Sequence, residues 1–174
     1  MCRGQIVTNP LIPNLEQRDR LSPEERQALE NAFVRTSTVC RGEDIVREGE
    51  RPAESKVLLE GFAARYKGLR NGKRQITALH VTGDFVDLHS FVLKPMDHAV
   101  LALTPCRLAL VPHQALRDLT EQYPHLARLF MLSIALDGAI HRQWLAMTGK
   151  AMALSQTAHL VCELPAAPCG RGGR

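Results

Sequence analysis

Residues 57–88, "VLLEGFAARYKGLRNGKRQITALHVTGDFVDL", decide which fold the sequence predicts. Two stretches rich in apolar and β-branched residues flank Asn71-Gly72, a dipeptide typical of a two-residue hairpin turn. After the turn the side chains alternate between two faces, with Ile76, Ala78 and His80 on one of them. The stretch therefore predicts two antiparallel strands joined by a tight turn.

Short strand-like segments continue on both sides of this hairpin, over residues 36–112. Turn residues separate them, among them Gly42, Gly49 and the pair Thr104-Pro105. Roughly seven or eight short strands at this spacing are typical of a closed antiparallel roll or barrel rather than a parallel sheet.

A helix is expected before the strands, at residues 21–33, "LSPEERQALENAF". Ser22 is a candidate N-cap, Pro23 suits the first helical position, and Glu25 completes an S-x-x-E capping box. These signals predict where this helix begins.

Beyond Pro112 the pattern is helical again. A short helix is expected up to the break at Pro124, and residues 125–150 then continue without a proline. In this long helix, residues at alternating four- and three-residue steps form a heptad seam: Leu126, Phe130, Ser133, Asp137, Ile140, Trp144 and Met147. Further apolar lines leave the helix apolar on nearly every side, so more than one neighbour must cover it. We therefore expect a homodimer along this seam; a buried helix within a monomer is the alternative.

Composition excludes several classes of protein. Hydrophobic residues make up 45% of the 174 residues and charged residues 23%, enough for a core. Twenty-two Lys and Arg against 18 Asp and Glu give +4, without a basic stripe that would mark a nucleic-acid surface. The five cysteines form no C-x-x-C pair, and no segment is typical of a signal peptide or membrane span, so a reduced cytoplasmic protein is expected.

The order of helix, strands, glycine-led loop and long helix resembles the cyclic-nucleotide-binding effector domain of Crp/Fnr-type transcription regulators. The residues that carry the resemblance are "GEDIVREGE" (42–50), residues 57–88 and the heptad helix with "AIHRQW" (139–144). The resemblance implies an α+β fold: an antiparallel β-roll of the double-stranded β-helix (jelly-roll-like) type with an N-terminal helix and a C-terminal dimerisation helix. The implied domains are the roll at 1–124 and the dimerisation helix at 125–150.

The remaining residues fall into two expected parts. Residues 151–164 resemble the first helix of the family's DNA-binding domain, and residues 165–174 form a Gly/Pro/Arg-rich tail. The sequence as written contains no recognition helix for a major groove, so a truncated regulator that does not bind DNA directly is expected. It could still act as a heterodimer with full-length relatives. In a further alternative, arginines of the tail contribute weak DNA binding.

The resemblance also implies a pocket behind the loop that follows Gly83. In the family a phosphate meets backbone N–H groups there, and a glutamate and an arginine complete the site. Here Asp87 and His98 fall near those two positions, and neither supplies the usual group. The candidate pocket residues are Gly83, Phe85, Val86, Asp87, Leu88, His89, Ser90, His98, Ala99 and His141. No cofactor is assigned; a cyclic nucleotide or another small effector is the candidate ligand.

Other chemistries have less support. No H-x-H or H-x-x-x-H pair fixes a metal among Asp84, Asp87, His89, Asp97 and His98. A haem ligated by a histidine or by Met96 has no more support. No nucleophile motif indicates an enzyme. On the long helix, Asp137 and His141 either complete the pocket or form an Asp–His pair that fixes the dimer register.

The predicted function is therefore a dimeric sensory domain that binds a small effector. The alternative is an interaction scaffold whose pocket is filled by Phe85, Leu88 and Phe91.

Overall fold

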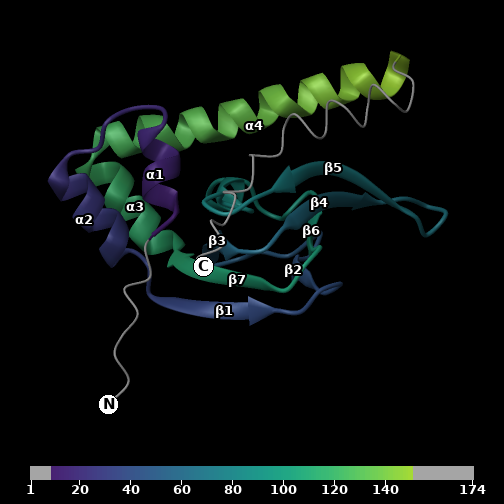
Figure 1. Ribbon diagram of the computed structural model, residues 1–174, viewed down its shortest axis with the longest axis horizontal. Helices are drawn as coiled ribbons and strands as arrows, with labels where there is room; N and C mark the ends of the chain where they lie inside the picture. Colours follow the sequence, from purple (N-terminus) through teal and green to yellow (C-terminus); the bar gives the residue numbers. More distant parts are fainter. Residues whose placement is uncertain (1–8, 151–174) are drawn as a thin grey trace, which may run out of the picture.

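The structure, a computed structural model, describes residues 9–150, with side chains up to residue 146. Two antiparallel sheets form the roll (Figure 1). The first sheet has the order β1 (Arg35–Val39), β7 (Cys106–Pro112) and β3 (Glu54–Glu60). The second has the order β2 (Asp44–Val46), β6 (Ala99–Ala102), β4 (Ala63–Gly68) and β5 (Arg74–His80). The predicted α+β fold with an antiparallel β-roll is confirmed.

A hairpin joins β4 to β5 as predicted, but its loop comprises residues 69–73 and is not the expected two-residue turn at Asn71-Gly72. Gly72 has a φ of 77°, a left-handed conformation that glycine adopts without a Cβ penalty. The N–H of Lys73 donates to Oδ1 of Asn71 at 3.0 Å and closes the turn. Ala78 and His80 are buried on the inner face of β5, as the alternation indicated.

The interior of the roll is apolar and tightly packed. Leu58 on β3 lies opposite Leu108 on β7, and both are buried. Val100 and Ala102 on β6 reach the same cluster from the second sheet. Burial of these side chains from both sheets is what closes the roll.

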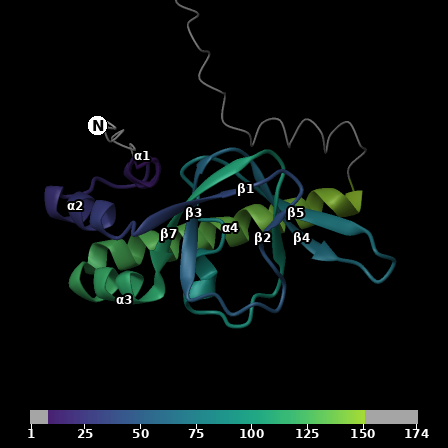
Figure 2. The same cartoon turned by 90° about the horizontal axis from the view of Figure 1, so that it is seen from below.

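Helices α1, α2 and α3 gather at one end of the roll (Figure 2). The predicted capping box is confirmed at α2 (Pro23–Asn31): Oγ of Ser22 accepts from the N–H of Glu25 at 3.2 Å, and the Glu25 carboxylate accepts from the N–H of Ser22 at 2.9 Å. Helix α1 (Leu11–Glu16) was not predicted.

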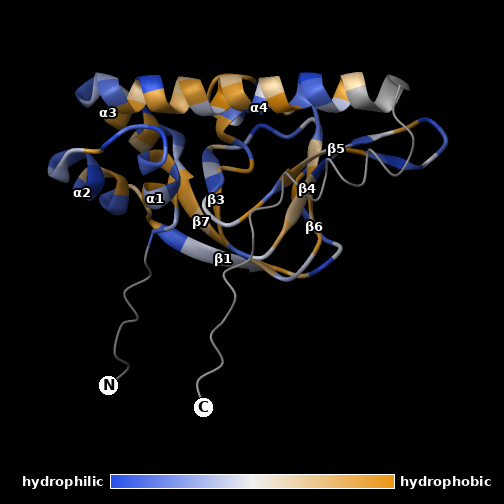
Figure 3. Cartoon of the chain, turned by 45° about the horizontal axis from the view of Figure 1, so that its top comes forward, coloured by the Kyte–Doolittle hydropathy of each residue, from blue (hydrophilic) through white to orange (hydrophobic). Residues whose placement is uncertain are grey.

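Helix α3 (His113–Gln122) ends before Pro124, and α4 (Pro124–Lys150) runs along the roll with apolar residues along much of its length (Figure 3). The structure corrects two residues of the predicted dimer seam on α4, Leu126 and Phe130. Leu126 and Phe130 are 0% and 5% exposed and belong to the core of their own chain, because this face of the helix is turned toward α3 and the roll. They are therefore not available to a partner.

Several sequence-based predictions lie outside the described residues. These are the segments 151–164 and 165–174 and the side chain of Met147. Within residues 9–150, no helix is both long enough and apolar enough to span a bilayer.

Candidate functional site

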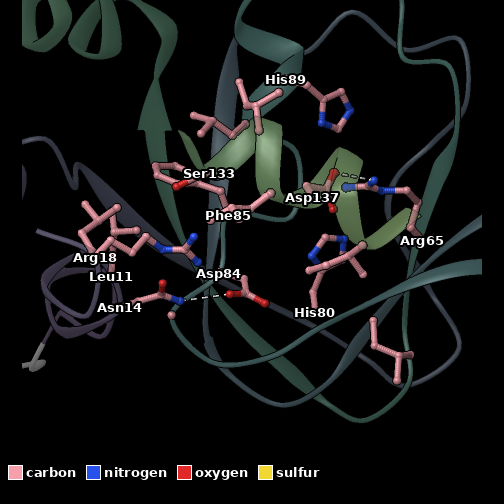
Figure 4. Close-up of a pocket in the computed structure, with 17 residues that line it drawn as sticks. Leu11, Asn14, Arg18, Arg65, His80, Asp84, Phe85, His89, Ser133 and Asp137 are labelled. Atoms are coloured by element: carbon pink, nitrogen blue, oxygen red, sulfur yellow. Dashed lines mark hydrogen bonds and ion pairs between the residues drawn. The ribbon is translucent and has the colours of Figure 1, made fainter. Parts of the chain in front are cut away.

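A cavity of about 140 Å³ lies between the roll, helix α1 and the middle of α4 (Figure 4). Its polar side chains come from four parts of the fold: α1, strands β4 and β5, the loop after β5 with the short helix η1 (Leu88–Phe91), and α4. The lining residues that the argument uses are Asn14, Arg65, His80, Asp84, His89 and Asp137.

Four of the predicted pocket residues line this cavity: Gly83, Phe85, Leu88 and His89. Gly83 has a φ of 96°, and a Cβ at this position would lie 2.8 Å from the carbonyl oxygen of Pro10. Only glycine allows the loop to pass so close to α1.

Asp87 does not line the cavity. Its side chain is fully buried, and Oδ1 accepts from the backbone N–H of Lys56 at 2.6 Å while Oδ2 lies 3.2 Å from Nζ of Lys56. Burial raises the pKa of Asp87, and Lys56 opposes that rise. The carboxylate therefore connects the beginning of η1 to β3 through Lys56 and is not placed to contact a ligand in the cavity.

Three further predicted residues are buried outside the cavity. Val86 belongs to the interior of the roll, and Ala99 pairs with Tyr66 in the second sheet. Oγ of Ser90 lies 3.2 Å from Nε2 of His113. These three side chains contact the rest of the chain and do not line the cavity.

His98 is buried next to the cavity but does not line it. Its Nδ1 lies 2.7 Å from Oδ1 of Asp97, and its ring packs on His89 with centroids 4.7 Å apart. Burial, reinforced by the nearby positive charge of Arg65, lowers the pKa of His98 to about 4. The imidazole is therefore neutral at pH 7.

Arg65 is the central residue of the site, and the sequence analysis missed it. Its side chain is 6% exposed, and Nη1 donates to Oδ2 of Asp137 on α4 at 2.7 Å (Figure 4). The same Nη1 lies 3.3 Å from Nδ1 of His141. Asp137 and His141, which the sequence left as either pocket or dimer residues, are thus both joined to the roll through Arg65.

The charges around Arg65 are balanced within the site. Burial raises the pKa of Asp137, but the guanidinium of Arg65 outweighs this effect, so the net pKa is lowered and the carboxylate is ionised. Burial and Arg65 both lower the pKa of His141. We call the contacts among Arg65, Asp137 and His141 the polar clip, because they hold the second half of α4 on the roll.

His80 lies below the polar clip (Figure 4). Burial, followed by the charge of Arg65, lowers the pKa of His80 to about 3. Its Nε2 is buried and has no hydrogen-bond partner within residues 9–146. The imidazole is therefore a neutral polar group available to a ligand in the cavity.

Helix α1 closes the opposite side of the cavity. Nδ2 of Asn14 donates to Oδ1 of Asp84 at 3.0 Å, and Oδ2 of Asp84 accepts from the N–H of Val81 at 2.9 Å. Burial raises the pKa of Asp84, and these hydrogen bonds oppose the rise. Sequence analysis missed this wall because α1 itself was not predicted.

One signal could have identified Arg65. Alternation on β4 gives it the same face as Ala63, which points into the roll, and an inward arginine needs a partner. Which partner it has depends on where α4 packs, and no local pattern contains that information.

The sequence profile described as "Cyclic nucleotide-binding domain" matches residues 36–123, about half of the chain. The chain belongs to the cyclic nucleotide-binding domain family. The match covers the roll from β1 to the end of α3 and includes the loop that borders the cavity. The resemblance inferred from the sequence is confirmed, including the similarity to Crp/Fnr-type regulators.

The relatives of this cyclic nucleotide-binding domain include a transcription regulator. The transcriptional activator Anr of Pseudomonas aeruginosa is 23% identical over 152 residues, which are 87% of this chain and 62% of Anr. The chain thus spans less than two thirds of Anr, and it spans 44% of the fumarate and nitrate reduction regulatory protein of Vibrio cholerae.

Solved structures show the same fold. FixK2 of Bradyrhizobium japonicum aligns with a TM-score of 0.68 at 22% identity, over 76% of this chain and 68% of FixK2. The c-di-GMP responsive regulator CLP of Xanthomonas campestris aligns with a TM-score of 0.69 at 10% identity, over 84% of this chain and 74% of CLP. Low identity with conserved architecture means that ligand-reading residues have to be argued for each chain separately.

Proposed function

We propose that this domain is the sensory part of a Crp/Fnr-type regulator and binds a small anionic effector in the cavity between the roll and α4. The observation that carries the proposal is the position of Arg65, a buried guanidinium at the cavity wall whose only carboxylate partner in residues 9–146 is Asp137 on α4. A guanidinium recognises phosphate or carboxylate groups through paired hydrogen bonds.

The mechanism is an exchange of partners at Arg65. An anionic effector competes with Asp137 for the guanidinium and so loosens the polar clip, while neutral His80 and His89 offer hydrogen bonds to the rest of the ligand. Because the clip is the polar attachment of the second half of α4, the effector shifts the equilibrium between a held and a released helix.

Two features bear on the identity of the effector. The cavity of about 140 Å³ is smaller than the roughly 300 Å³ at the lower end for drug-sized ligands, so a nucleotide requires α4 to move outward. Asp87 is engaged by Lys56, and His98 cannot replace an arginine at a phosphate. CLP, which shares the fold, is c-di-GMP responsive, and PfPKA-R, which shares it too, has been solved with cAMP bound, so nucleotides belong in the test panel.

Dimerisation through α4 is the second part of the proposal. The outer face of the helix exposes Met131 (70%) and Leu145 (74%), with Leu132 also exposed. Ile134 and Ile140 are exposed too, but they border the cavity. The residues of the outer face replace Leu126 and Phe130 as the contacts we propose between two copies, or between this chain and a full-length relative. The setting of the proposal is transcriptional control in the cytoplasm, since the relative Anr is a transcriptional activator. In the proposal the roll covers residues 1–124 and the dimerisation helix residues 125–150, the two sharing one core.

Thermal-shift titration of the full chain tests effector binding. The panel contains inorganic phosphate, cyclic AMP, cyclic GMP and cyclic di-GMP, and a rise in Tm with one of them is expected for the native chain. Arg65→Gln should lose the rise. Arg107→Gln is the matched control, because Arg107 also pairs with a carboxylate, Glu60, at 2.6 Å but on the outer surface. Loss of binding in the control would contradict the assignment to Arg65.

The variant Asp137→Asn should have the opposite effect on binding to Arg65→Gln, and this contrast tests the exchange of partners at Arg65. Removing the competing carboxylate should tighten binding of the same anion by about tenfold, the equivalent of one charged hydrogen bond. Unchanged or weaker binding would contradict the exchange of partners.

The alternative function is a scaffold that binds no ligand. The observation in its favour is that Arg65 is already neutralised and the cavity is small. No rise in Tm across the whole panel, together with an intact dimer, is the outcome that supports the scaffold.

A further inference from the structure

We propose that His89, Asp97 and His98 form a binding site for a divalent transition-metal ion. One ligand atom from each of the three residues lies within 4.8 Å of those of the other two. This site shares His89 with the wall of the effector cavity, but the proposal does not depend on the exchange of partners at Arg65.

The three residues come from the two ends of one loop. His89 lies in the first turn of η1, and Asp97 and His98 directly precede β6. The two imidazole rings lie against each other, with centroids 4.7 Å apart and planes inclined at 42°. A bound ion would therefore tie η1 to the beginning of β6 and close the intervening loop.

Unsatisfied nitrogens are the second, independent observation. Nε2 of His98 and Nε2 of His89 are both buried, and neither has a hydrogen-bond partner within residues 9–146. His98 as a whole is 6% exposed. Buried imidazole nitrogens are normally hydrogen-bonded. Two neighbouring rings whose buried Nε2 atoms both lack a partner therefore indicate a shared binding partner, one that accepts a lone pair from each nitrogen.

In the structure Asp97 accepts at 2.7 Å from the Nδ1 side of the His98 ring, which orients the ring and leaves Nε2 with its lone pair. To bind an ion at Nε2 as the third ligand, the Asp97 carboxylate has to leave Nδ1 and turn toward the ion. The turn that carries His89 is itself anchored, since Asp87 bonds Lys56 and Ser90 bonds His113. Both nitrogen donors are therefore held in position before an ion binds.

The charge of the surroundings allows a cation despite the nearby Arg65. With the histidines neutral, the charged side chains that face His89 are the guanidinium of Arg65 and the carboxylates of Asp97 and Asp137. The guanidinium is paired with Asp137, which leaves the charge of Asp97 for an ion.

The donor set determines the class of metal. Two imidazole nitrogens and one carboxylate oxygen suit Zn²⁺, Co²⁺ or Ni²⁺, whereas Ca²⁺ and Mg²⁺ prefer oxygen ligands only. Ligand atoms around a tetrahedral Zn²⁺ lie roughly 3.3 Å apart for bonds of about 2.0–2.1 Å, so small side-chain rotations have to bring the three residues together. Three protein ligands leave one position for water or for an anion.

Titration of the EDTA-treated full chain with Zn²⁺ and Co²⁺ tests the site. Cysteines are alkylated beforehand, because thiolates bind the same ions. We expect one Zn²⁺ per chain with a Kd of about 10 µM or tighter, a rise in Tm, and a visible Co²⁺ absorption band typical of tetrahedral coordination. Absence of stoichiometric binding to either ion overturns the proposal.

Variants assign the ligands. His98→Gln and His89→Gln should each weaken Zn²⁺ binding by about 100-fold or more, and Asp97→Asn by at least about 10-fold. His125→Gln is the matched control: His125 also lies near carboxylates, 2.9 Å from Glu25, yet it is outside the cluster. Full-affinity binding in the double variant of His89 and His98 overturns the proposal, as does loss of binding in the control.

X-ray absorption of the Zn²⁺-loaded native chain keeps the test decisive if a variant does not fold. Two imidazole ligands and no sulfur are expected. A spectrum with fewer than two imidazoles overturns the assignment.

Discussion

The two halves of α4 are attached to the same roll in different ways. In the first half, Leu126, Leu129 and Phe130 are at most 5% exposed and belong to the core. In the second half, Ile140 and Leu145 are 45% and 74% exposed, and the polar clip joins the helix to β4. Apolar burial is worth about 1.5–3 kcal/mol for each large side chain, whereas an ion pair that loses its hydration contributes much less net free energy. The first half is thus anchored by apolar burial, and the second half is attached through the polar clip, the part of the helix that the proposed effector would release.

The largest expected effect comes from the anchored first half. Phe130→Ala removes a ring that packs edge-on against Phe85, with centroids 5.9 Å apart, and should lower the free energy of unfolding by about 3–5 kcal/mol. Urea denaturation measures the change. Leu145→Ala on the exposed half is the control and should change stability by about 0.5 kcal/mol or less. Equal losses in the two variants would abolish the distinction between the halves.

Lowering the pH should reduce the stability of the folded chain through His80, which lies beneath the second half of α4 (Figure 4). The pKa of His80 in the folded chain is about 3, below the ordinary value of 6.5, because of burial and Arg65; Asp137 opposes this, and His89 and His98 add to it. The unfolded chain therefore binds a proton at His80 that the folded chain does not, so stability is lost as pH falls below 6.5.

Between pH 6.5 and pH 5 this single group should lower the free energy of unfolding by about 2 kcal/mol. His80→Gln should reduce the slope of stability against pH over this range, as measured by denaturation at a series of pH values. An unchanged slope would mean that His80 is not buried as a neutral group.

Breaking the polar clip should have a smaller effect on global stability and a local effect on α4. Asp137→Ala leaves Arg65 without a carboxylate and should cost about 1–2 kcal/mol, less than for a fully buried pair because the Asp137 side chain is 35% exposed. Hydrogen exchange should accelerate in the second half of α4 and not in the first.

A double variant separates charge from packing at the clip. In Arg65→Leu with Asp137→Leu, both buried charges are gone, and stability should return toward that of the native chain. If hydrogen exchange in the Asp137→Ala variant accelerates equally in both halves of α4, the polar clip is not what holds the second half of the helix.

The smallest effect on the folded chain, and the largest on its association, is expected on the outer face of α4. Met131→Lys with Leu145→Lys should leave the free energy of unfolding of the isolated chain within about 0.5 kcal/mol but dissociate the proposed dimer. Analytical ultracentrifugation measures the association. Arg128→Gln, an exposed polar position on the same helix, should have no effect.

Local patterns predicted much of the fold and little of the site. Ser22 and Glu25 cap α2 because the capping box needs only residues three apart, and Gly72 turns the hairpin because a tight turn needs only its own dihedral angles. By contrast, α1 was not predicted: it is only six residues long, and its residues Leu11, Ile12 and Leu15 are buried only once the roll is in place. Gly83, Phe85, Leu88 and His89, which the family resemblance implied, line the cavity together because they belong to one continuous stretch of chain.

The sequence by itself determined the roll, its turns, the capped helix and the existence of a long apolar helix, since periodicity and turn chemistry act over a few neighbouring residues. Only the tertiary structure decided which face of α4 is buried, that Asp87 serves Lys56, and that Arg65 meets Asp137 across 72 residues of chain. These outcomes depend on how an apolar helix is rotated against the roll. Several faces of α4 are apolar enough to be buried, so the choice among them rests on the partner surface and not on the helix.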